Sequence, residues 1–451
     1  MNFNGSMRLS KTNTILYLCI VGVILIFVSV ITFKPSDLAG WLLSLCNFGM
    51  LFVIPKLHKN KRLFMVIFAA VLIREIFAFT NAYFFILDPR LGDDQFFRLS
   101  AIELAKNHPF TWFYMAGEGF YISFLGFFYA LLGRSYLLGE ELSIFAFILS
   151  CIFLLKLFDL LEIKQNHAWL VALYSFIPFQ ILLSSDTMRE SWETLFLMMT
   201  VYFGLEYNLK KKWTSMWKAI ISAFILCLFH YALLVYSGIL IPLVLLYKPY
   251  KGGHSKPLKV NFRRLTGWVV VIGGVVLVAV LMYKILGLKT ITPLYLFHKE
   301  VEYRRSVKGF GRSYYGIQID SSSPLRLIET TAEAYLYFLF GPFPWDIKVY
   351  IEFYYVFEAV VRTILILSSF YAWLNSPKSY RKILNVLLMV YLSINFMWGI
   401  AIPSYGTAAR HMMISYWIII ATGGPTLFTA IEKKFRLQNA GASIIPAVNT
   451  K

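Results

Sequence analysis

Apolar runs close to the length of a membrane-spanning helix follow one another along most of this chain. Of its 451 residues, 58% are hydrophobic and only 15% are charged. A spanning helix needs about 20 consecutive apolar residues, so a chain of this composition has little sequence left for a soluble domain. We therefore predict an all-α, polytopic helical membrane protein. Residues 1–437 are expected to form a single transmembrane domain, followed by a disordered cytoplasmic tail at 438–451.

Basic residues cluster in the short segments between these runs, and the clusters predict which side is cytoplasmic. The net charge of +19 is spread over many such segments. This distribution follows the positive-inside rule and argues against a nucleic-acid partner. Placing every cluster inside predicts a multi-pass protein of the cell membrane with both termini in the cytoplasm. The clusters lie at 8–11, 56–62, 210–218, 248–264, 378–382 and 433–436.

The same rule fixes which apolar segments cross. Each helix must return the chain to the side that its next basic cluster requires, so segments 117–133 and 326–341 are predicted to lie in the outer interface without crossing. The run between 218 and 248 becomes a hairpin of two short helices turning near His230. We predict about 12 crossings and two juxtamembrane or re-entrant helices on the external face. The crossings include 14–33, 37–55, 63–87, 139–160, 168–185, 190–207, 349–374, 383–401 and 412–430.

An acidic motif opens the external loop 88–116, directly after an apolar run. Asp93 and Asp94 are adjacent, and Arg98 follows four residues after Asp94. A charge at the centre of a bilayer costs about 2.5–3.5 kcal/mol on insertion scales, so charged groups next to a membrane span are candidates for function. The alternative is that the pair begins a helix, where Asp is favourable at the cap and in the first turn.

Further charged residues fall in the other external segments. Asp186, Arg189 and Glu190 lie in the turn before the helix at 190–207, although Asp186 could also simply cap that helix. The positive-inside rule disfavours arginines in external segments, so their presence there suggests a function. Guanidinium groups bind phosphate through two parallel hydrogen bonds. We therefore expect an anionic ligand at the outer face. The arginines are Arg304, Arg305 and Arg312 in the external loop 287–348, and Arg410 in the last external turn.

Carboxylates beside arginines at a membrane surface suit glycosyl transfer from a polyprenyl-phosphate-linked sugar. The leaving phosphate is a weak base and needs no general acid, so one carboxylate is enough to deprotonate the acceptor hydroxyl. Arginines stabilise the charge that grows on the released phosphate. Two adjacent carboxylates can have different catalytic roles if one is buried and the other is exposed. Asp93 and Asp94 could instead share a divalent cation, and the sequence leaves this open.

The acidic motif and the non-crossing segment after it resemble the GT-C superfamily of membrane glycosyltransferases. Members use lipid-linked sugar donors at the external face and place an acidic motif in the first large external loop. The resemblance implies that Asp93 and Asp94 are catalytic, with a second carboxylate from Asp186 or Glu190 in the next external turn. It also implies that Arg410 contacts the donor phosphate. The chain departs from the family in having two helices, rather than one, before the helix that leads into the acidic loop.

These considerations give one set of candidate residues. Asp93, Asp94, Asp186 and Glu190 are predicted to be catalytic. Substrate binding is assigned to Arg98, Arg189, His230, Arg304, Arg305, Arg312 and Arg410. No cofactor is required, although a divalent cation remains possible. The expected partners are a polyprenyl-phosphate-linked sugar, membrane lipids, and a glycan, lipid or protein acceptor.

Two other functions remain open. One is a polymerase or ligase of the O-antigen or exopolysaccharide type. Such proteins also have about a dozen helices, and they rely on arginines in large external loops. Arg305 and Arg312 resemble arginines of this kind. A transporter or flippase of lipid-linked glycans is the third possibility. Transporters usually carry ionisable groups at the bilayer midplane and contain inverted repeats. Here only Arg74 and Glu75 lie in the middle of a helix, where we expect buried structural pairing.

Overall fold

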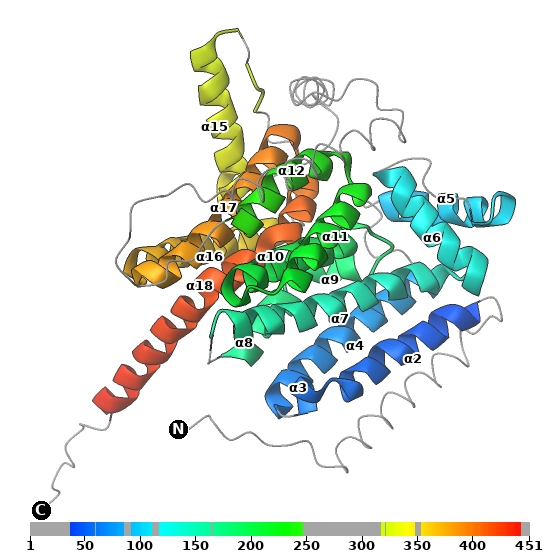
Figure 1. The fold of residues 1–451 in the computed structure, drawn as a ribbon, viewed down its shortest axis with the longest axis horizontal. Helices are drawn as coiled ribbons and strands as arrows, with labels where there is room; N and C mark the ends of the chain where they lie inside the picture. The colour runs from blue at the N-terminus through cyan, green and yellow to red at the C-terminus, as the bar shows by residue number, and fades with distance from the viewer. Residues whose placement is uncertain are drawn as a thin grey trace, which may run out of the picture.

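The computed structural model of the protein describes residues 37–58, 60–84, 92–110, 117–163, 166–246, 317–320, 322–347 and 353–442. Within these ranges the chain is helical and contains no β-strand (Figure 1). This confirms the predicted all-α class. The predicted helix at 14–33, the start of the acidic loop and most of the loop 287–348 lie outside the described residues.

The described α-helices differ widely in length, from four residues to 38 residues. The first half contains α2 (Leu38–Val53), α3 (Pro55–His58), α4 (Lys61–Tyr83), α5 (Asp93–Asn107), α6 (Glu118–Leu132), α7 (Tyr136–Leu160), α8 (His167–Ser175) and α9 (Pro178–Ser184). The second half contains α10 (Glu190–Lys210), α11 (Trp213–Phe229), α12 (Tyr231–Leu246), α15 (Pro324–Phe340), the short 3-10 helix η3 (Pro344–Asp346), α16 (Phe353–Asn375), α17 (Lys378–Ala401) and α18 (Tyr405–Ala442).

Five of the described helices are long and apolar enough to cross a membrane, namely α4, α7, α16, α17 and the part of α18 that runs from Tyr405 to Lys434. A sixth span is present if the bent pair of α8 and α9 is counted as one. These long apolar helices support a protein embedded in a membrane. The larger number of crossings stays a prediction.

The segment 168–185 is not the single straight helix that we predicted. It breaks between α8 and α9, whose axes differ in direction by 69°. Pro178 is the first residue of α9, and Ile177 before it is extended. Proline lacks the N–H that would continue the hydrogen-bond ladder, and it disfavours the helical conformation of the residue that precedes it. The break directs the end of α9 toward the turn that contains Asp186.

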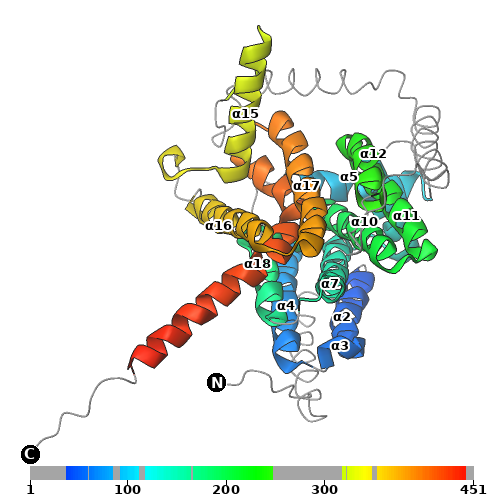
Figure 2. The same cartoon turned by 60° about the vertical axis from the view of Figure 1, so that its left-hand side comes forward.

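Helix α10 lies at the centre of the bundle and contacts α7, α11, α12 and α18 (Figures 1 and 2). Helices α2 and α4 pack against α7 on one side, and α16 and α17 pack against α18 on the other. The core contains many aliphatic and aromatic side chains, such as Trp417, Phe147 and Leu154, and it also buries a number of polar and charged ones. The predicted hairpin in 218–248 is confirmed, since α11 and α12 meet at His230.

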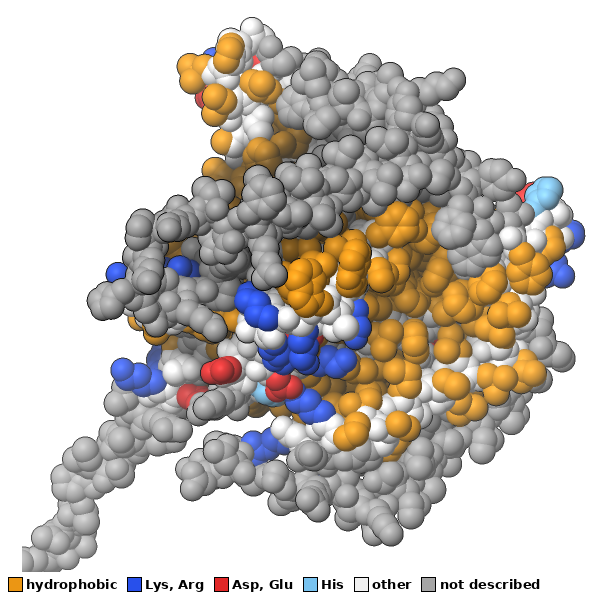
Figure 3. Space-filling view, in the orientation of Figure 1, with side chains coloured by type: hydrophobic (Ala, Val, Ile, Leu, Met, Phe, Trp, Pro, Cys, Tyr) orange, Lys and Arg blue, Asp and Glu red, His pale blue; other side chains and the backbone are white. Residues whose placement is uncertain are grey.

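Buried carboxylates lie near the starts of α7 and α10, and exposed basic side chains lie near their ends, together with Asp159 and Glu206. Helix α7 begins near Glu140 and ends beside α3, where Lys56 donates to the carbonyl of Leu155 at 3.1 Å. Helix α10 begins at Glu190 and ends at Lys210. Figure 3 shows a broad apolar surface, with a group of Lys and Arg side chains beside it and others near the left and right edges of this face. The side of the membrane that each end faces stays a prediction from the positive-inside rule.

Two further helices stand apart from the long spans. Helix α6, in the segment predicted to lie in the interface, has 15 residues and packs on α5. Helix α15, in the second such segment, projects away from the bundle (Figure 1). It exposes Leu325, Ile328 and Leu336. At the C-terminus α18 continues to Ala442. Residues 438–442, which we predicted to belong to a disordered tail, are therefore helical.

Candidate functional site

Charged side chains from five parts of the sequence meet at one end of the bundle. They come from the start of α5, the start of α7, the turn between α9 and α10, the start of α10 and the start of α18. The group, which we call the acidic cluster, consists of Asp93, Asp94, Arg98, Glu140, Asp186, Arg189, Glu190, Glu193, Arg410 and His411.

Arg98 holds one half of the acidic cluster together. Its Nη2 donates to Glu140 at 2.6 Å and lies 3.6 Å from Asp186 and 3.9 Å from Asp94. All four side chains are buried. One guanidinium thus faces three carboxylates that come from three different helices or turns. Buried charges persist only when they are paired, so this arginine is the main electrostatic link between α5, α7 and the turn before α10.

Arg410 holds the other half. From the second turn of α18 it donates to Asp93 and to Glu190. Arg189 lies 3.5 Å from Glu193 and 3.9 Å from Glu190. Asp93 differs from its neighbours because 56% of its side-chain surface is exposed. The adjacent carboxylates Asp93 and Asp94 therefore lie in different environments, one open to the surface and one buried.

Negative charge exceeds positive charge in the acidic cluster. Six carboxylates face three arginines, and five of the six carboxylates are buried. The arginines neutralise at most half of the carboxylate charge. A buried excess of this kind is expensive, so the cluster must bind protons, a cation or a ligand that carries positive charge.

Asp186 is one place where a proton is held. Burial raises the pKa of Asp186 to about 7, and the negative charge of Asp94 acts in the same direction. The backbone N–H of Thr187 donates to Oδ1 of Asp186 at 2.7 Å. Arg98 opposes the rise in pKa and favours the ionised form. Asp186 therefore changes its charge near neutral pH, in the range where a carboxylate works well as a general base.

Polar atoms without a hydrogen-bond partner concentrate around the acidic cluster. They include one carboxylate oxygen of Glu140, one of Glu190, both of Glu193 and Nδ1 of His411. Most buried polar atoms in folded proteins have a partner in the protein or in ordered water. A group of buried atoms that lack a protein partner is therefore typical of a site that binds water, an ion or a ligand.

Aromatic rings close one side of the acidic cluster. His411 stacks on Trp398 with ring centroids 4.1 Å apart, and His230 contacts Trp398 edge to face at 4.8 Å. His230 and His411 lie 5.7 Å from each other, measured between centroids. His230 is also fixed locally, because its Nδ1 accepts a hydrogen bond from the backbone of Ala232 at 3.2 Å. The turn between α11 and α12 thus carries an imidazole to the edge of the site.

The local sequence explains how these groups reach one place. Asp93 and Asp94 are the first two residues of α5, where the helix dipole favours negative charge. Gly139 lets α7 approach the turn before α10, because a Cβ at this position would lie 2.7 Å from the hydroxyls of Thr187 and Tyr129. A larger residue at 139 would push Glu140, the next residue, away from Arg98.

Most of the predicted site residues are brought together. Asp93, Asp94, Asp186, Glu190, Arg98, Arg189 and Arg410 all belong to the acidic cluster, and His230 lies at its edge. Arg410 lies inside α18 and not in the external turn that we predicted, since this helix begins at Tyr405. The positions predicted for Arg304, Arg305 and Arg312 lie outside the described residues.

Sequence reasoning gave no role to Glu140, Glu193 or Trp398. Glu193 could have been found, because it follows Glu190 by three residues and must share its helix face. Glu140 could not be found from the sequence, because its neighbour Glu141 is also a glutamate and nothing in the sequence indicates which of the two faces Arg98. Trp398 lies in an apolar run, where nothing distinguishes it from a core residue.

Arg74 and Glu75 are buried, as we predicted, but each binds other partners. Arg74 donates to the hydroxyl of Ser184 at 2.6 Å and to the carbonyl of Ser175 at 2.9 Å, and its guanidinium covers the Phe147 ring. Glu75 accepts from Ser44 at 2.7 Å. Arg74 therefore binds a backbone carbonyl at the end of α8 and a side chain of α9, which stabilises the break between them.

The chain was compared with protein-family models, with curated proteins and with solved structures, and no match was found in any of them. Any function must therefore be inferred from the site itself.

Proposed function

We propose that this protein is a membrane glycosyltransferase that moves a sugar from a polyprenyl-phosphate-linked donor to an acceptor hydroxyl at the external face. The observation that carries the proposal is the meeting of Asp93 and Asp94 with Asp186, Glu190 and Arg410 at one end of an apolar helical bundle. The site combines carboxylates, arginines and one open edge next to membrane-spanning helices. Each is a feature that transfer from a lipid phosphate requires.

In the proposed reaction the acceptor oxygen attacks the anomeric carbon of the sugar. The bond from that carbon to the phosphate oxygen breaks, and its electron pair leaves with the polyprenyl phosphate. The proton of the acceptor hydroxyl passes to a carboxylate of the buried pair Asp94 and Asp186. Arg410, whose partner Asp93 is exposed, lies nearest the open edge and is the candidate to bind the departing phosphate.

The proposal predicts that activity rises with pH through about 7. Only the ionised form of Asp186 accepts a proton, and its pKa is raised to about 7. A rate that is independent of pH between 5.5 and 8.5, or one that falls, would contradict this role. The measurement is transfer activity against pH, for the wild type and for Asp186→Asn, whose residual rate should lose this pH dependence.

The raised pKa of Asp186 also affects stability. Its usual value is 3.8, so between about 4 and 7 the folded protein holds a proton here that the unfolded chain does not. The stabilising contribution of this group is complete below about pH 4 and is lost as the pH rises through 7. Unfolding of the purified protein in detergent, measured across this range, should therefore show less loss of stability with rising pH in Asp186→Asn than in wild type.

The surface glycans of a deletion strain test the proposed function. Loss of a single sugar decoration, restored by wild type but not by the double variant Asp93→Asn/Asp94→Asn, is the expected result. Loss of long chains with single repeat units retained would instead indicate a polysaccharide polymerase. Full rescue by the double variant would show that the acidic pair only begins a helix, and would overturn the proposed mechanism.

Thiol labelling in intact cells tests the proposal that the acidic cluster faces the outside of the membrane. In a background without native cysteines, Gln95→Cys should react with a membrane-impermeant thiol reagent in intact cells. Gln95 is exposed, two residues after Asp93. Lys211→Cys, at the basic end of α10, should react only after the cells are opened. The reverse pattern would place the acidic cluster in the cytoplasm, where it could not use an external acceptor.

A further inference from the structure

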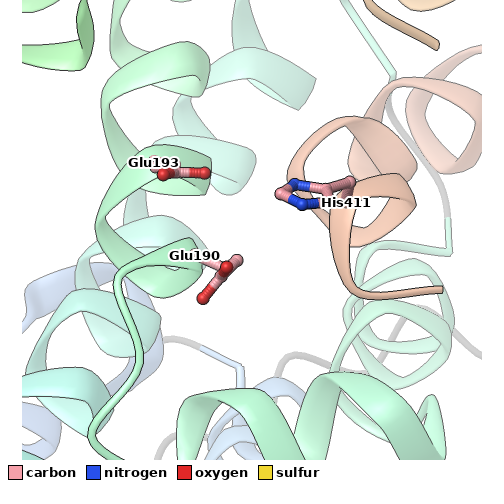
Figure 4. A group of neighbouring side chains, drawn as sticks. All are labelled: Glu190, Glu193 and His411. Carbon is pink, nitrogen blue, oxygen red and sulfur yellow. The ribbon is translucent and has the colours of Figure 1, made fainter. Parts of the chain in front are cut away.

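Glu190, Glu193 and His411 form a compact group inside the acidic cluster. One ligand atom from each lies within 4.8 Å of the others (Figure 4). The two carboxylates come from the first turn of α10, and the imidazole comes from α18, which is more than 200 residues further along the chain. Figure 4 shows the side chains of the two helices facing one another.

The atoms that would bind an ion in this group lack hydrogen-bond partners. Nδ1 of His411, Oε2 of Glu190 and both carboxylate oxygens of Glu193 are buried and make no hydrogen bond. The side chains of Glu190 and Glu193 are fully buried, and His411 is 5% exposed. Arg410 binds the other oxygen of Glu190, which leaves Oε2 available. An imidazole nitrogen and three carboxylate oxygens are therefore buried without a hydrogen bond, although Oε1 of Glu193 lies 3.5 Å from the Nε of Arg189.

Nearby charge favours a cation at this position. Asp93, Glu190 and Glu193 face Arg189 and Arg410, so this half of the acidic cluster retains one negative charge when its carboxylates are ionised. The other half contains Asp94, Glu140 and Asp186 around a single arginine. A divalent cation would offset this excess and satisfy the unpartnered oxygens together.

From these observations we propose that Glu190, Glu193 and His411 bind a divalent transition-metal ion, with Zn²⁺ or Mn²⁺ preferred over Mg²⁺. Imidazole is a ligand for first-row transition metals, while Mg²⁺ prefers oxygen ligands and retains water. Zinc binds His nitrogen and carboxylate oxygen at about 2.0–2.2 Å, so the ligand atoms of a tetrahedral site lie about 3.4 Å apart. Their separations of up to 4.8 Å would have to shorten by about 1 Å when the ion binds, a change that side-chain rotation can supply. Three protein ligands leave a fourth position for water or a substrate oxygen.

Trp398 orients the proposed ligand His411. The indole stacks on the imidazole at 4.1 Å between centroids and with 20° between the ring planes. This contact limits rotation of the ring and keeps Nδ1 toward the two carboxylates. The metal proposal does not depend on glycosyl transfer, because its test is metal binding by the protein itself.

Equilibrium dialysis of the full-length protein against Zn²⁺ in detergent, followed by elemental analysis, tests this site. The affinity tag must be removed first, since a polyhistidine tag binds zinc. We expect one Zn²⁺ per chain in the wild type, and a loss of affinity of more than about 10-fold in Glu193→Gln and in His411→Gln. Glu206→Gln is the matched control, because Glu206 lies on the same helix but binds Ser215 at 2.7 Å, and it should bind Zn²⁺ as wild type does.

Two results would overturn the metal site. One is a folded wild type that binds no Zn²⁺ or Mn²⁺, or that binds Mg²⁺ equally well. The other is unchanged affinity in both ligand variants. If a ligand variant does not fold, the visible absorption of Co²⁺ bound to wild type provides a second measurement, since a tetrahedral site with imidazole and carboxylate ligands gives characteristic bands. Absence of these bands in Co²⁺-loaded wild type also contradicts the proposal.

Discussion

Replacing Asp94 with asparagine is expected to lower transfer activity by about 10²- to 10⁴-fold while leaving the protein at least as stable as wild type. Activity falls because the buried pair loses the carboxylate that takes up or shares the acceptor proton. Stability is maintained because Asp94 adds negative charge to a site that already has too much, and asparagine fills the same volume. The measurements are glycan restoration in the deletion strain and thermal unfolding of the purified variant.

The two effects of Asp94→Asn distinguish a catalytic group from a structural one. A residue that only begins α5 would lose some stability and no activity on replacement. The variant should also lower the pKa of Asp186, because the negative charge of Asp94 is one of the causes that raise it. Any residual activity should therefore persist to lower pH than in wild type. Asp159→Asn is a suitable control, since Asp159 is exposed and pairs with Lys56 at the opposite end of the bundle.

Replacing Arg98 with glutamine is expected to destabilise the protein by about 3–5 kcal/mol, the cost of removing one partner from a buried ion pair. Arg98 faces Asp94, Glu140 and Asp186 from a position that is only 6% exposed, so its loss leaves three buried carboxylates without their main cation. Equilibrium unfolding in mixed detergent micelles measures the change. Arg326→Gln is the control, because its ion pair with Glu329 is exposed and contributes less than about 1 kcal/mol.

A second substitution tests whether charge causes the effect of Arg98→Gln. Adding Glu140→Gln removes the carboxylate that Arg98 binds at 2.6 Å, and should restore part of the lost stability. Equal stability of the single and double variants would show that Arg98 contributes through packing alone. Wild-type stability in Arg98→Gln would contradict the assignment of Arg98 as the link between α5 and α7.

Composition and charge distribution alone determined the class of this protein. Apolar runs of spanning length leave few alternatives to a helical membrane protein, and the five long apolar helices agree with that class. The hairpin at His230 followed from the same reasoning. These inferences succeed because insertion depends on local hydrophobicity and local charge, which the sequence states directly.

Tertiary structure decided which charged residues form the site. Asp93 and Arg410 are 317 positions apart, and no periodicity in the sequence connects them. Glu140 faces Arg98 while Glu141 accepts from Asn47 at 2.9 Å, because successive residues on a helix point in different directions. The difference in burial between Asp93 and Asp94 has the same origin, since it depends on which side of α5 faces the interior, where Arg98 of the same helix binds Glu140. The types of residue in the site could be predicted from local chemistry. Their partners could not, because burial and pairing depend on contacts between distant helices that only the folded chain makes.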